Sequence, residues 1–199
     1  MSEVLQVKIV FLGNTGVGKT CIINRFARDR FNEETDCTLG AIFTSKVIEY
    51  PDINISIRYQ IWDTAGQEIY RCLASMYYKE ATVAVLVYDI TSKKTFEGLK
   101  QWIEELKEKA DENIMIAIVG NKLDLLHLEE VKIDEAKEFA ENNNALFTQT
   151  SAKDGMGINE LFDSIAVRLK LFKSKEATTN RDSTKIKNKE KHKVKKNCC

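Results

Sequence analysis

Residues 7–26 of the chain read VKIVFLGNTGVGKTCIINRF. An apolar, β-branched run, Val7–Leu12, leads directly into a glycine-containing loop, and the apolar positions after that loop recur at helical spacing. The loop Gly13–Thr20 matches G-x-x-x-x-G-K-[ST], in which the glycines let successive backbone N–H groups turn inward around phosphates. A strand before the loop and a helix after it make an ordinary glycine turn the weaker interpretation. The sequence therefore predicts a nucleoside triphosphate site.

This phosphate loop predicts a role for each of its polar groups. Lys19 is expected to reach the terminal phosphates, and Thr20 is expected to place its hydroxyl on Mg²⁺. The helix that begins near Lys19 adds its positive N-terminal end to the same site. We therefore predict that eight consecutive residues contribute to nucleotide binding, Asn14, Thr15, Gly16, Val17, Gly18, Lys19, Thr20 and Cys21.

Strand-like and helix-like runs alternate along the rest of the chain. Most of the strand-like runs are almost continuously apolar, which is typical of parallel strands covered on both faces. The run Ala41–Tyr50, which Pro51 separates from the next, is expected to form an antiparallel hairpin at the sheet edge. The fold predicted is α/β, a P-loop NTPase with a doubly wound, six-stranded, mostly parallel sheet, one antiparallel edge strand and helices on both faces. The expected strands are Val7–Leu12, Ala41–Tyr50, Ile55–Trp62, Val83–Tyr88, Ile114–Val119 and residues 146–150, and the expected helices are Lys19–Arg28, Thr95–Ala110, Asp134–Asn142 and Ile158–Phe172.

The identity of the base is indicated by NKLD, Asn121–Asp124, directly after a predicted strand. The Asp124 carboxylate can accept hydrogen bonds from the ring N–H and the exocyclic amine of guanine, a pair of donors that adenine does not offer. Asn121 is expected to steady the loop and reach the base edge, while the Lys122 stem lies along the ring plane. Alone, N-K-x-D is also a common surface turn. Its place at a strand end, about a hundred residues after the phosphate loop, favours guanine.

A third motif, DTAGQ at Asp63–Gln67, follows another predicted strand. Asp63 is placed to hold Mg²⁺ through a water, and Gly66 lets the backbone approach the γ-phosphate. Gln67 is the catalytic candidate, because its amide could orient the attacking water. The alternative interpretation of this stretch is a polar turn.

Two weaker signals complete the predicted site. Thr38 lies in a stretch without helical or strand periodicity, and either supplies a second metal hydroxyl from a mobile loop or is an ordinary turn or N-cap threonine. The tripeptide Ser151, Ala152 and Lys153 follows the last predicted strand, where the Ala152 N–H would reach the guanine carbonyl oxygen. That tripeptide carries no weight by itself.

Composition divides the chain into two parts. Its 199 residues are 43% apolar and 30% charged, which suits one globular domain with an appendage. Residues 173–199 contain ten Lys and Arg and three Asp and Glu, so the net charge of this segment is +7 and that of the remainder is −7. We expect a domain over residues 1–172 and a disordered basic tail over 173–199 that meets an anionic surface. No secretory signal or membrane-spanning run is expected, and the scattered Cys21, Cys37 and Cys72 are expected to be cytosolic thiols.

Taken together, GNTGVGKT, TLG, WDTAGQE, NKLD and TSAK resemble the small GTPases of the Ras superfamily over about residues 5–172. Within that superfamily the chain resembles the Rab branch through TLGAIF, IWDTAGQE, MYY, VYDIT and the terminal Cys-Cys. The stretches LASMYY, NIMIAIVGNKLDL and LFTQTSAKDGMGINELF are similar to the early-endosomal Rabs. The resemblance implies that Phe31 and Lys153 enclose the guanine ring and that Thr20 and Thr38 hold Mg²⁺. It also implies an aromatic trio that effectors contact, Phe43, Trp62 and Tyr77.

The chain departs from the family pattern at several positions. Ile69 stands where the family usually has Arg, Ser75 where it commonly has Pro, and Glu80 where it commonly has Gly. All three fall in or beside the second switch, so they bear on which regulator or effector fits. Thr15 stands where Rabs tend to have a smaller residue, and its side chain could tune the hydrolysis rate.

The tail ends in Cys198 and Cys199, which do not match the C-a-a-X prenylation pattern. The Rab resemblance implies geranylgeranylation of both, and two lipids with a basic patch anchor a protein stably. The alternative is an oxidisable thiol pair beside a nuclear-type basic run.

The resemblance implies a monomeric switch in which GTP and Mg²⁺ order about Asn32–Gly40 and Gln67–Tyr78, and hydrolysis to GDP relaxes both segments. With no arginine supplied in cis, turnover is expected to be slow and to need a GTPase-activating protein. The other implied partners are effector proteins, an exchange factor, and prenyl-escort and dissociation-inhibitor proteins. The implied location is the cytosol and the cytoplasmic face of an intracellular membrane, endosomal by resemblance.

Three other classes of function share some of these sequence features. A P-loop kinase shares the phosphate loop, but NKLD disfavours ATP. A nucleotide-binding module without hydrolysis is disfavoured by Gln67. Nucleic-acid binding by the tail is disfavoured by the absence of interleaved aromatics and by the acidic body.

Overall fold

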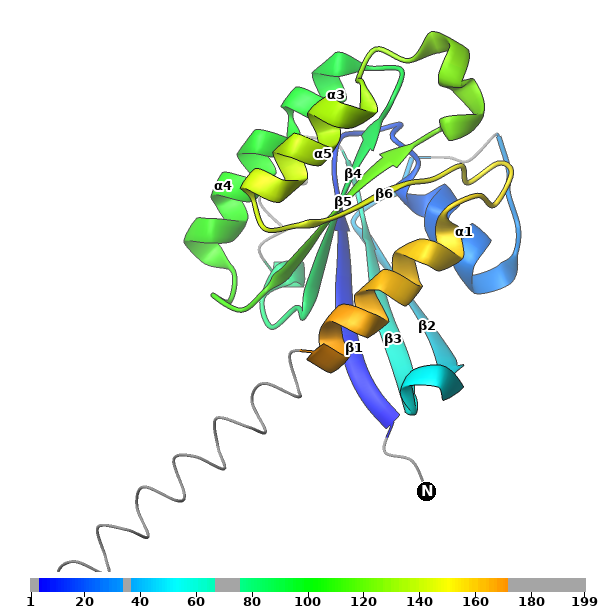
Figure 1. Ribbon diagram of the computed structural model, residues 1–199, viewed down its shortest axis with the longest axis vertical. Coiled ribbons are helices and arrows are strands. Elements are labelled where there is room, and N and C mark those ends of the chain that lie inside the picture. The colour runs from blue at the N-terminus through cyan, green and yellow to red at the C-terminus, as the bar shows by residue number, and fades with distance from the viewer. Residues whose placement is uncertain (1–3, 34–36, 67–75, 172–199) are drawn as a thin grey trace, which may run out of the picture.

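The computed structural model describes residues 4–33, 37–66 and 76–171. Six strands form one sheet in the order β2-β3-β1-β4-β5-β6, as Figure 1 shows. β2 runs antiparallel to β3 at the sheet edge, and every other neighbouring pair is parallel. The predicted fold class is confirmed. The strands are β1 Val4–Leu12, β2 Ala41–Tyr50, β3 Ile55–Thr64, β4 Val83–Asp89, β5 Met115–Asn121 and β6 Leu146–Gln149.

Helices cover both faces of this sheet (Figure 1). On one face lie α1 and the helix formed by residues 158–171, and on the other lie α3, α4 and α5. Alternate residues of β1 divide between the two cores: Ile9 and Phe11 enter the first, and Val10 and Leu12 enter the second. All four are fully buried, because a parallel strand in the middle of a sheet is covered on both sides. The labelled helices are α1 Lys19–Arg28, α3 Lys93–Glu97, α4 Leu99–Lys109 and α5 Ile133–Asn142.

The expected bounds hold for α1 and β2, but the helix predicted over Thr95–Ala110 was wrong in its ends and continuity. It begins at Lys93 and is divided into α3 and α4 at Gly98, a residue with low helix propensity. The central strands extend past their predicted ends, to Thr64 in β3 and Asp89 in β4. Thr64 donates to the Phe11 carbonyl at 2.6 Å, and Asp89 accepts from Thr91 at 2.7 Å. Polar residues with such partners can continue a strand, whereas a prediction based on apolar runs ends before them.

The departure at Glu80 has a backbone consequence. Its φ is +60°, in the left-handed region where glycine carries no Cβ penalty, so the family's common glycine would fit this conformation more easily. The departures Ile69 and Ser75 lie outside the described residues, as does the predicted tail 173–199. No helix in the described part of the chain has the length and apolar content needed to cross a membrane.

Candidate nucleotide-binding site

A cavity of about 400 Å³ opens at the carboxyl ends of the parallel strands. In doubly wound sheets this edge is where ligands bind, because loops from several strands meet there. The predicted phosphate, base and metal motifs all contribute to its wall. The predicted residues that line it are Thr15, Gly16, Gly18, Lys19, Thr20, Cys21, Phe31, Thr38, Gly66, Asn121, Lys122, Asp124, Ala152 and Lys153.

Three predicted contacts, Asn14, Val17 and Ser151, do not line the cavity but support residues that do. The carbonyls of Asn14 and Val17 accept hydrogen bonds from Lys19 and Asn121, and Ser151 donates to Asp124. Gln67, the predicted catalytic residue, lies outside the described residues, as do Cys198 and Cys199.

The phosphate loop wraps around the Lys19 ammonium. Lys19 is 5% exposed, and its Nζ donates to the carbonyls of Gly13 at 2.8 Å and Asn14 at 2.9 Å. Burial lowers the pKa of the Lys19 ammonium from 10.5 to about 8, and the nearby Asp63 charge opposes this shift. A buried ammonium that is bonded to two carbonyls and lies near one carboxylate charge is well suited to attract phosphate oxygens.

Two hydroxyls and a carboxylate meet beside this loop. Thr20 Oγ1 donates to Asp63 Oδ2 at 2.7 Å, while Thr38 Oγ1 lies 2.9 Å from Thr20 Oγ1 and 3.4 Å from Asp63 Oδ2. Asp63 is 2% exposed, and its Oδ1 is buried with no hydrogen-bond partner among the described residues. Burial raises the pKa of the Asp63 carboxyl, and the Thr20 hydrogen bond and the Lys19 charge act against this.

These three oxygen-bearing side chains fit Mg²⁺, which prefers oxygen ligands and keeps several waters. The unpaired Asp63 Oδ1 is the observation that favours a cation here, because a buried carboxylate oxygen without a partner is costly. Within the described residues, no group of three or more His, Cys, Asp or Glu side chains could hold a metal. A cation at this place would therefore depend on hydroxyl oxygens and a single carboxylate.

At the other end of the cavity, Asn121 joins three chain segments. It is 2% exposed; its Nδ2 donates to the Val17 carbonyl at 2.8 Å, and its Oδ1 accepts from Thr150 Oγ1 at 3.0 Å and the Ala152 N–H at 3.3 Å. Gly18 has a φ of +94°, and a Cβ there would lie 2.3 Å from Asn121 Nδ2. The glycine is therefore required for the amide to reach the phosphate loop.

The predicted base-reading carboxylate is held in place by a neighbouring hydroxyl. Ser151 Oγ donates to Asp124 Oδ1 at 2.7 Å and accepts from the Asp154 N–H at 3.0 Å. A carboxylate has about four acceptor sites, so this contact leaves Asp124 able to accept further hydrogen bonds. At the rim of the cavity, Lys153 Nζ lies 2.7 Å from Glu33 Oε1. This ion pair links the two walls of the cavity mouth, the segment after α1 and the loop that carries Ala152.

Gly66 brings the end of the third motif against the phosphate loop. A Cβ at this position would lie 2.5 Å from the Thr15 nitrogen and 2.6 Å from the Asn14 carbonyl oxygen. Real Cβ atoms do not approach backbone so closely, so only glycine fits without a shift of one of the two segments. Movement of the Gly66 backbone is therefore coupled to movement of the phosphate loop.

The aromatic trio lies on β2, β3 and residues 76–78. Phe43 and Trp62 have ring centroids 5.3 Å apart, and Trp62 and Tyr77 have centroids 5.5 Å apart. Phe43 is 51% exposed, whereas Trp62 and Tyr77 are partly buried against the second core. The Lys8 ammonium lies 5.8 Å from the Trp62 ring centroid, which adds a positive charge beside the aromatic surface.

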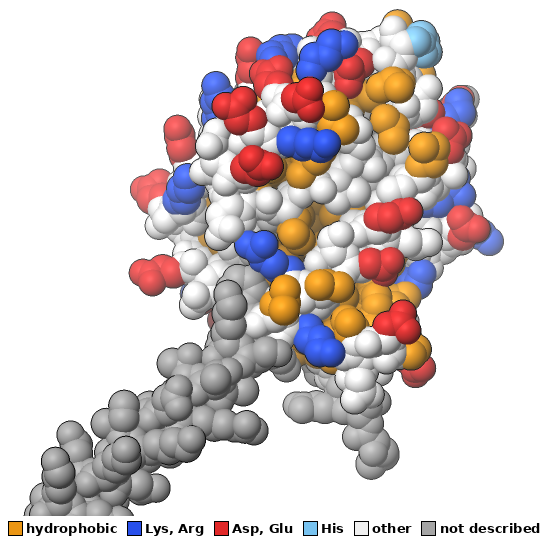
Figure 2. Space-filling model, viewed as in Figure 1, with side chains coloured by type: hydrophobic (Ala, Val, Ile, Leu, Met, Phe, Trp, Pro, Cys, Tyr) orange, Lys and Arg blue, Asp and Glu red, His pale blue; other side chains and the backbone are white. Residues whose placement is uncertain are grey.

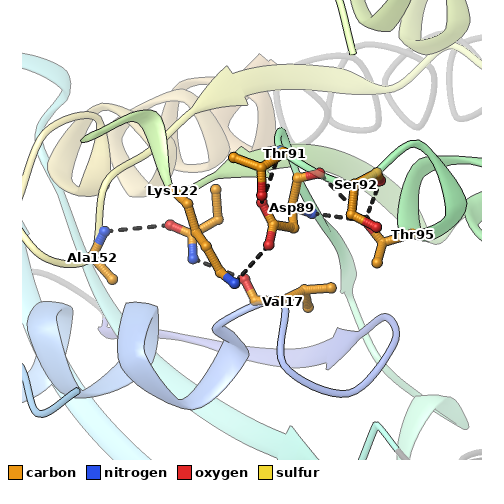
Figure 3. Close-up of polar contacts among 8 residues, drawn as sticks. Val17, Asp89, Thr91, Ser92, Thr95, Lys122 and Ala152 are labelled. Atoms are coloured by element: carbon orange, nitrogen blue, oxygen red, sulfur yellow. Dashed lines mark hydrogen bonds and ion pairs between the residues drawn. The ribbon is translucent and has the colours of Figure 1, made fainter. Parts of the chain in front are cut away.

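Several residues at this site were not predicted from the sequence as site residues: Asp89 and the cavity-lining Asn32, Glu33, Cys37, Thr64 and Leu125. Of these, Asp89 and Glu33 form ion pairs with predicted site residues. Asp89 Oδ2 lies 2.6 Å from Lys122 Nζ, as Figure 3 shows. The available signal was the same one that identified Asp63, namely an acidic residue at the end of an apolar strand. Glu33 offered no such signal, because it lies in an irregular segment far in sequence from Lys153.

Known proteins are similar to this chain over most of its length. Residues 8–171 match the Ras family. The chain is 45% identical over 164 residues to Ras-related protein Rab-22A of Canis lupus familiaris, an alignment that covers 82% of this chain and 84% of that protein. It is 46% identical over 166 residues to Ras-related protein Rab-31 of Rattus norvegicus, covering 83% of this chain and 84% of that protein.

A strand–loop–helix phosphate site at the carboxyl edge of a parallel sheet defines a P-loop nucleoside triphosphatase. Because the match extends over nearly the whole described chain, this protein belongs to the Ras family. Its sequence identity of 45% to Rab-22A and 46% to Rab-31 shows that it is a Rab-type small GTPase, an enzyme that hydrolyses GTP to GDP. The resemblance found in the motifs is thereby confirmed.

Proposed function

We propose that this Rab-type GTPase is a molecular switch that binds GTP and GDP with Mg²⁺ and recruits effector proteins to a membrane in its GTP form. The observation that carries the proposal is the convergence of Thr20 and Thr38 on the buried Asp63. These residues come from the phosphate loop, the segment before β2, and the end of β3. A ligand bound among them would hold all three segments together, and its loss would release them.

Phosphates would bind along the loop from Asn14 to Cys21, with Lys19 supplying charge. The start of α1 at Lys19 and the loop residues that line the cavity support this assignment. Guanine would lie between Phe31 and the Lys122 and Lys153 stems at the other end. Its base edge would be read by Asn121, Asp124 and the Ala152 N–H, with Ser151 orienting Asp124.

Thr20 and Thr38 would hold Mg²⁺ directly, and Asp63 would hold it through a water. When bound, the ion neutralises charge on the β- and γ-phosphates. The Lys19 ammonium would stabilise the same oxygens, and the Gly66 N–H would donate to the γ-phosphate. Gln67 is assigned to orient the attacking water, a role that stays a prediction. Positioning and charge account for most catalysis of this kind, so intrinsic turnover is expected to be slow without an arginine from an activating protein.

In the GTP form, contacts to Thr38 and Gly66 would fix the segments on either side of the aromatic trio. Phe43, Trp62 and Tyr77 would then present one surface to effectors. After hydrolysis those contacts are lost and the surface changes. An exchange factor would restore GTP, and a GTPase-activating protein would end the cycle.

The membrane part of the proposal rests on the tail. Geranylgeranyl groups on Cys198 and Cys199, added with a prenyl-escort protein, would anchor the chain together with the basic residues of 173–199. A dissociation-inhibitor protein would hold the lipidated form in the cytosol. Similarity to Rab-22A and Rab-31 supports a role in vesicle trafficking, and we assign it to the cytoplasmic face of endosomes.

The test begins with competition of GTP against ATP on the purified chain, followed by phosphate release from bound GTP. Preference for guanine and slow release of phosphate are expected; preference for ATP would overturn the proposal. Gln67→Leu should hold the GTP form, and unchanged single-turnover hydrolysis, with and without activating protein, would remove Gln67 from the mechanism. Intact mass of protein from its native membrane would test the lipids, and identification of its bound nucleotide would test the ligand.

A further inference from the structure

Asp89 is a buried carboxylate that the proposed mechanism does not use. It is the last residue of β4 and is 7% exposed. Its backbone pairs in parallel register with Asn121 of β5, which brings it beside the base end of the cavity although the two residues are distant in sequence. A carboxylate so deeply buried needs both hydrogen bonds and a counter-charge.

The two oxygens of Asp89 have different partners. Oδ1 accepts from the Thr91 N–H at 2.9 Å and from Thr91 Oγ1 at 2.7 Å, so it closes the turn after β4. Oδ2 lies 2.6 Å from Lys122 Nζ, and the close-up in Figure 3 shows the lysine side chain extending toward it. One oxygen therefore serves the local turn, and the other is committed to the NKLD loop.

Lys122 is held at both ends. Its backbone has a φ of +70°, an uncommon conformation for lysine, and the next N–H, from Leu123, donates to the Thr150 carbonyl at 3.0 Å. Its ammonium is bound by Asp89. The aliphatic stem between these two points lines the cavity. A lysine loses more rotamer freedom than most side chains when it is fixed, and here contacts within the protein fix both of its ends.

We propose that Asp89 is a positioning residue for nucleotide binding: it fixes the Lys122 side chain so that the methylene stem forms a preorganised wall against the flat face of the purine base. The inference rests on the proposed function, since it takes the cavity to bind a guanine nucleotide. Asp89 does not touch the ligand. Its effect passes through Lys122, and loss of the carboxylate charge should speed release of the nucleotide.

The experiment measures release of a fluorescent GDP from the full-length chain, chased with excess GDP at fixed Mg²⁺. Asp89→Asn retains an acceptor for Thr91 but loses the charge that binds Lys122, and release should be about 3–10-fold faster, the range for one side chain that is no longer preorganised. Thr91→Val is the matched control. It removes the hydroxyl bond to the other oxygen of Asp89 and should lower the melting temperature while leaving the release rate within about twofold.

A double-mutant cycle separates positioning from general stability. In a Lys122→Met background, Asp89→Asn should cause no further acceleration, because the group it positions is already gone. The acceleration should also be equal for GDP and inosine diphosphate, which lacks the exocyclic amine, since stacking and not base-edge pairing is affected. Additive effects, unequal acceleration, or the same acceleration in Thr91→Val would overturn the inference.

Circular dichroism of each variant checks folding, and Asp89→Ser replaces Asp89→Asn where the latter does not fold. Wild-type chain that does not bind GDP would defeat the proposed function itself. Wild-type chain that binds GDP, with release unchanged in Asp89→Asn, would defeat only the role of Asp89.

Discussion

At the base end of the cavity the Asn121 amide makes its hydrogen bonds within the protein, whereas at the phosphate end a buried oxygen of Asp63 has no partner among the described residues. Base-end side chains are also tied individually, Lys122 to Asp89 and Asp124 to Ser151. Thr20 and Thr38 are instead bonded to each other and to one shared carboxylate oxygen.

This difference matches the two tasks that the proposed switch must combine. Selection of a base requires groups that are already in place, because preorganisation lowers the cost of binding. A response to the γ-phosphate requires groups whose arrangement changes when a ligand comes or goes. A single rigid cavity would perform the first task and fail the second.

Asp124→Asn tests the preformed end and should have the largest effect. The amide presents a donor to the guanine N–H groups and loses two charge-assisted hydrogen bonds, each contributing roughly 1.5–3 kcal/mol, so GDP affinity should fall by about 10²–10⁴-fold. Calorimetric titration measures this. Asp154→Asn, an exposed neighbour in the Ser151 loop, is the control and should bind GDP as the wild type does. Equal affinity in the two variants would contradict the assignment of Asp124.

Gly66→Ala tests the contact between the phosphate loop and the end of the third motif. The added methyl would meet backbone of Asn14 and Thr15 at 2.5–2.6 Å, so one segment must shift. A misplacement of about 1 Å can cost 10²-fold in rate, and single-turnover GTP hydrolysis should fall by about that factor. GDP affinity should change far less, because base contacts are distant. Unchanged hydrolysis would show that this approach is not needed for the reaction.

Asp63→Asn tests whether the unpaired oxygen is a cation site. In the wild type, removal of Mg²⁺ with a chelator should speed GDP release by roughly tenfold or more, the effect of losing one strong electrostatic contact of about 1.4 kcal/mol or more. In the variant, release should be fast already and nearly insensitive to chelator. Measured rates with and without chelator decide the matter, and a variant as sensitive as wild type would refute the metal role of Asp63.

Glu33→Gln tests the rim and should have the smallest effect. The Glu33–Lys153 ion pair joins the two walls but is solvent-exposed, with side chains 69% and 51% exposed. Exposed ion pairs are weak and are screened by salt, so GDP release should speed up by less than about fivefold, and the difference should shrink at high salt. A large, salt-independent effect would mean that Glu33 acts in some other way.

Much of the fold followed from local pattern. The loop Gly13–Thr20 between a strand and a helix, and the continuous apolar runs of β4 and β5, were sufficient for a doubly wound sheet. The division of one expected helix at Gly98 and the polar ends of β3 and β4 were not anticipated. Whether a terminal residue joins a strand depends on its neighbour across the sheet, which one-dimensional periodicity does not contain.

The sequence motifs predicted most of the residues that line the cavity, but not the acidic residues that hold two of those side chains in place. Asp63 and Asn121 belong to short contiguous motifs with chemical meaning, so their place could be inferred. Asp89 acts on Lys122 through the register of two parallel strands, and Glu33 meets Lys153 across the cavity mouth. Such pairings depend on tertiary placement. The sequence marks Asp89 as an acidic residue at the end of an apolar strand, but no spacing along the chain indicates that it pairs with Lys122 or that Glu33 pairs with Lys153.

The hydrogen bonds of Asn121 have a consequence for nucleotide exchange. One amide connects the phosphate loop at Val17, the start of the NKLD loop and the Ala152 loop. A partner that moves any one of these segments strains the connection to the other two. An exchange factor that displaces only the phosphate loop would thereby also weaken the contacts to guanine, although it does not contact the base.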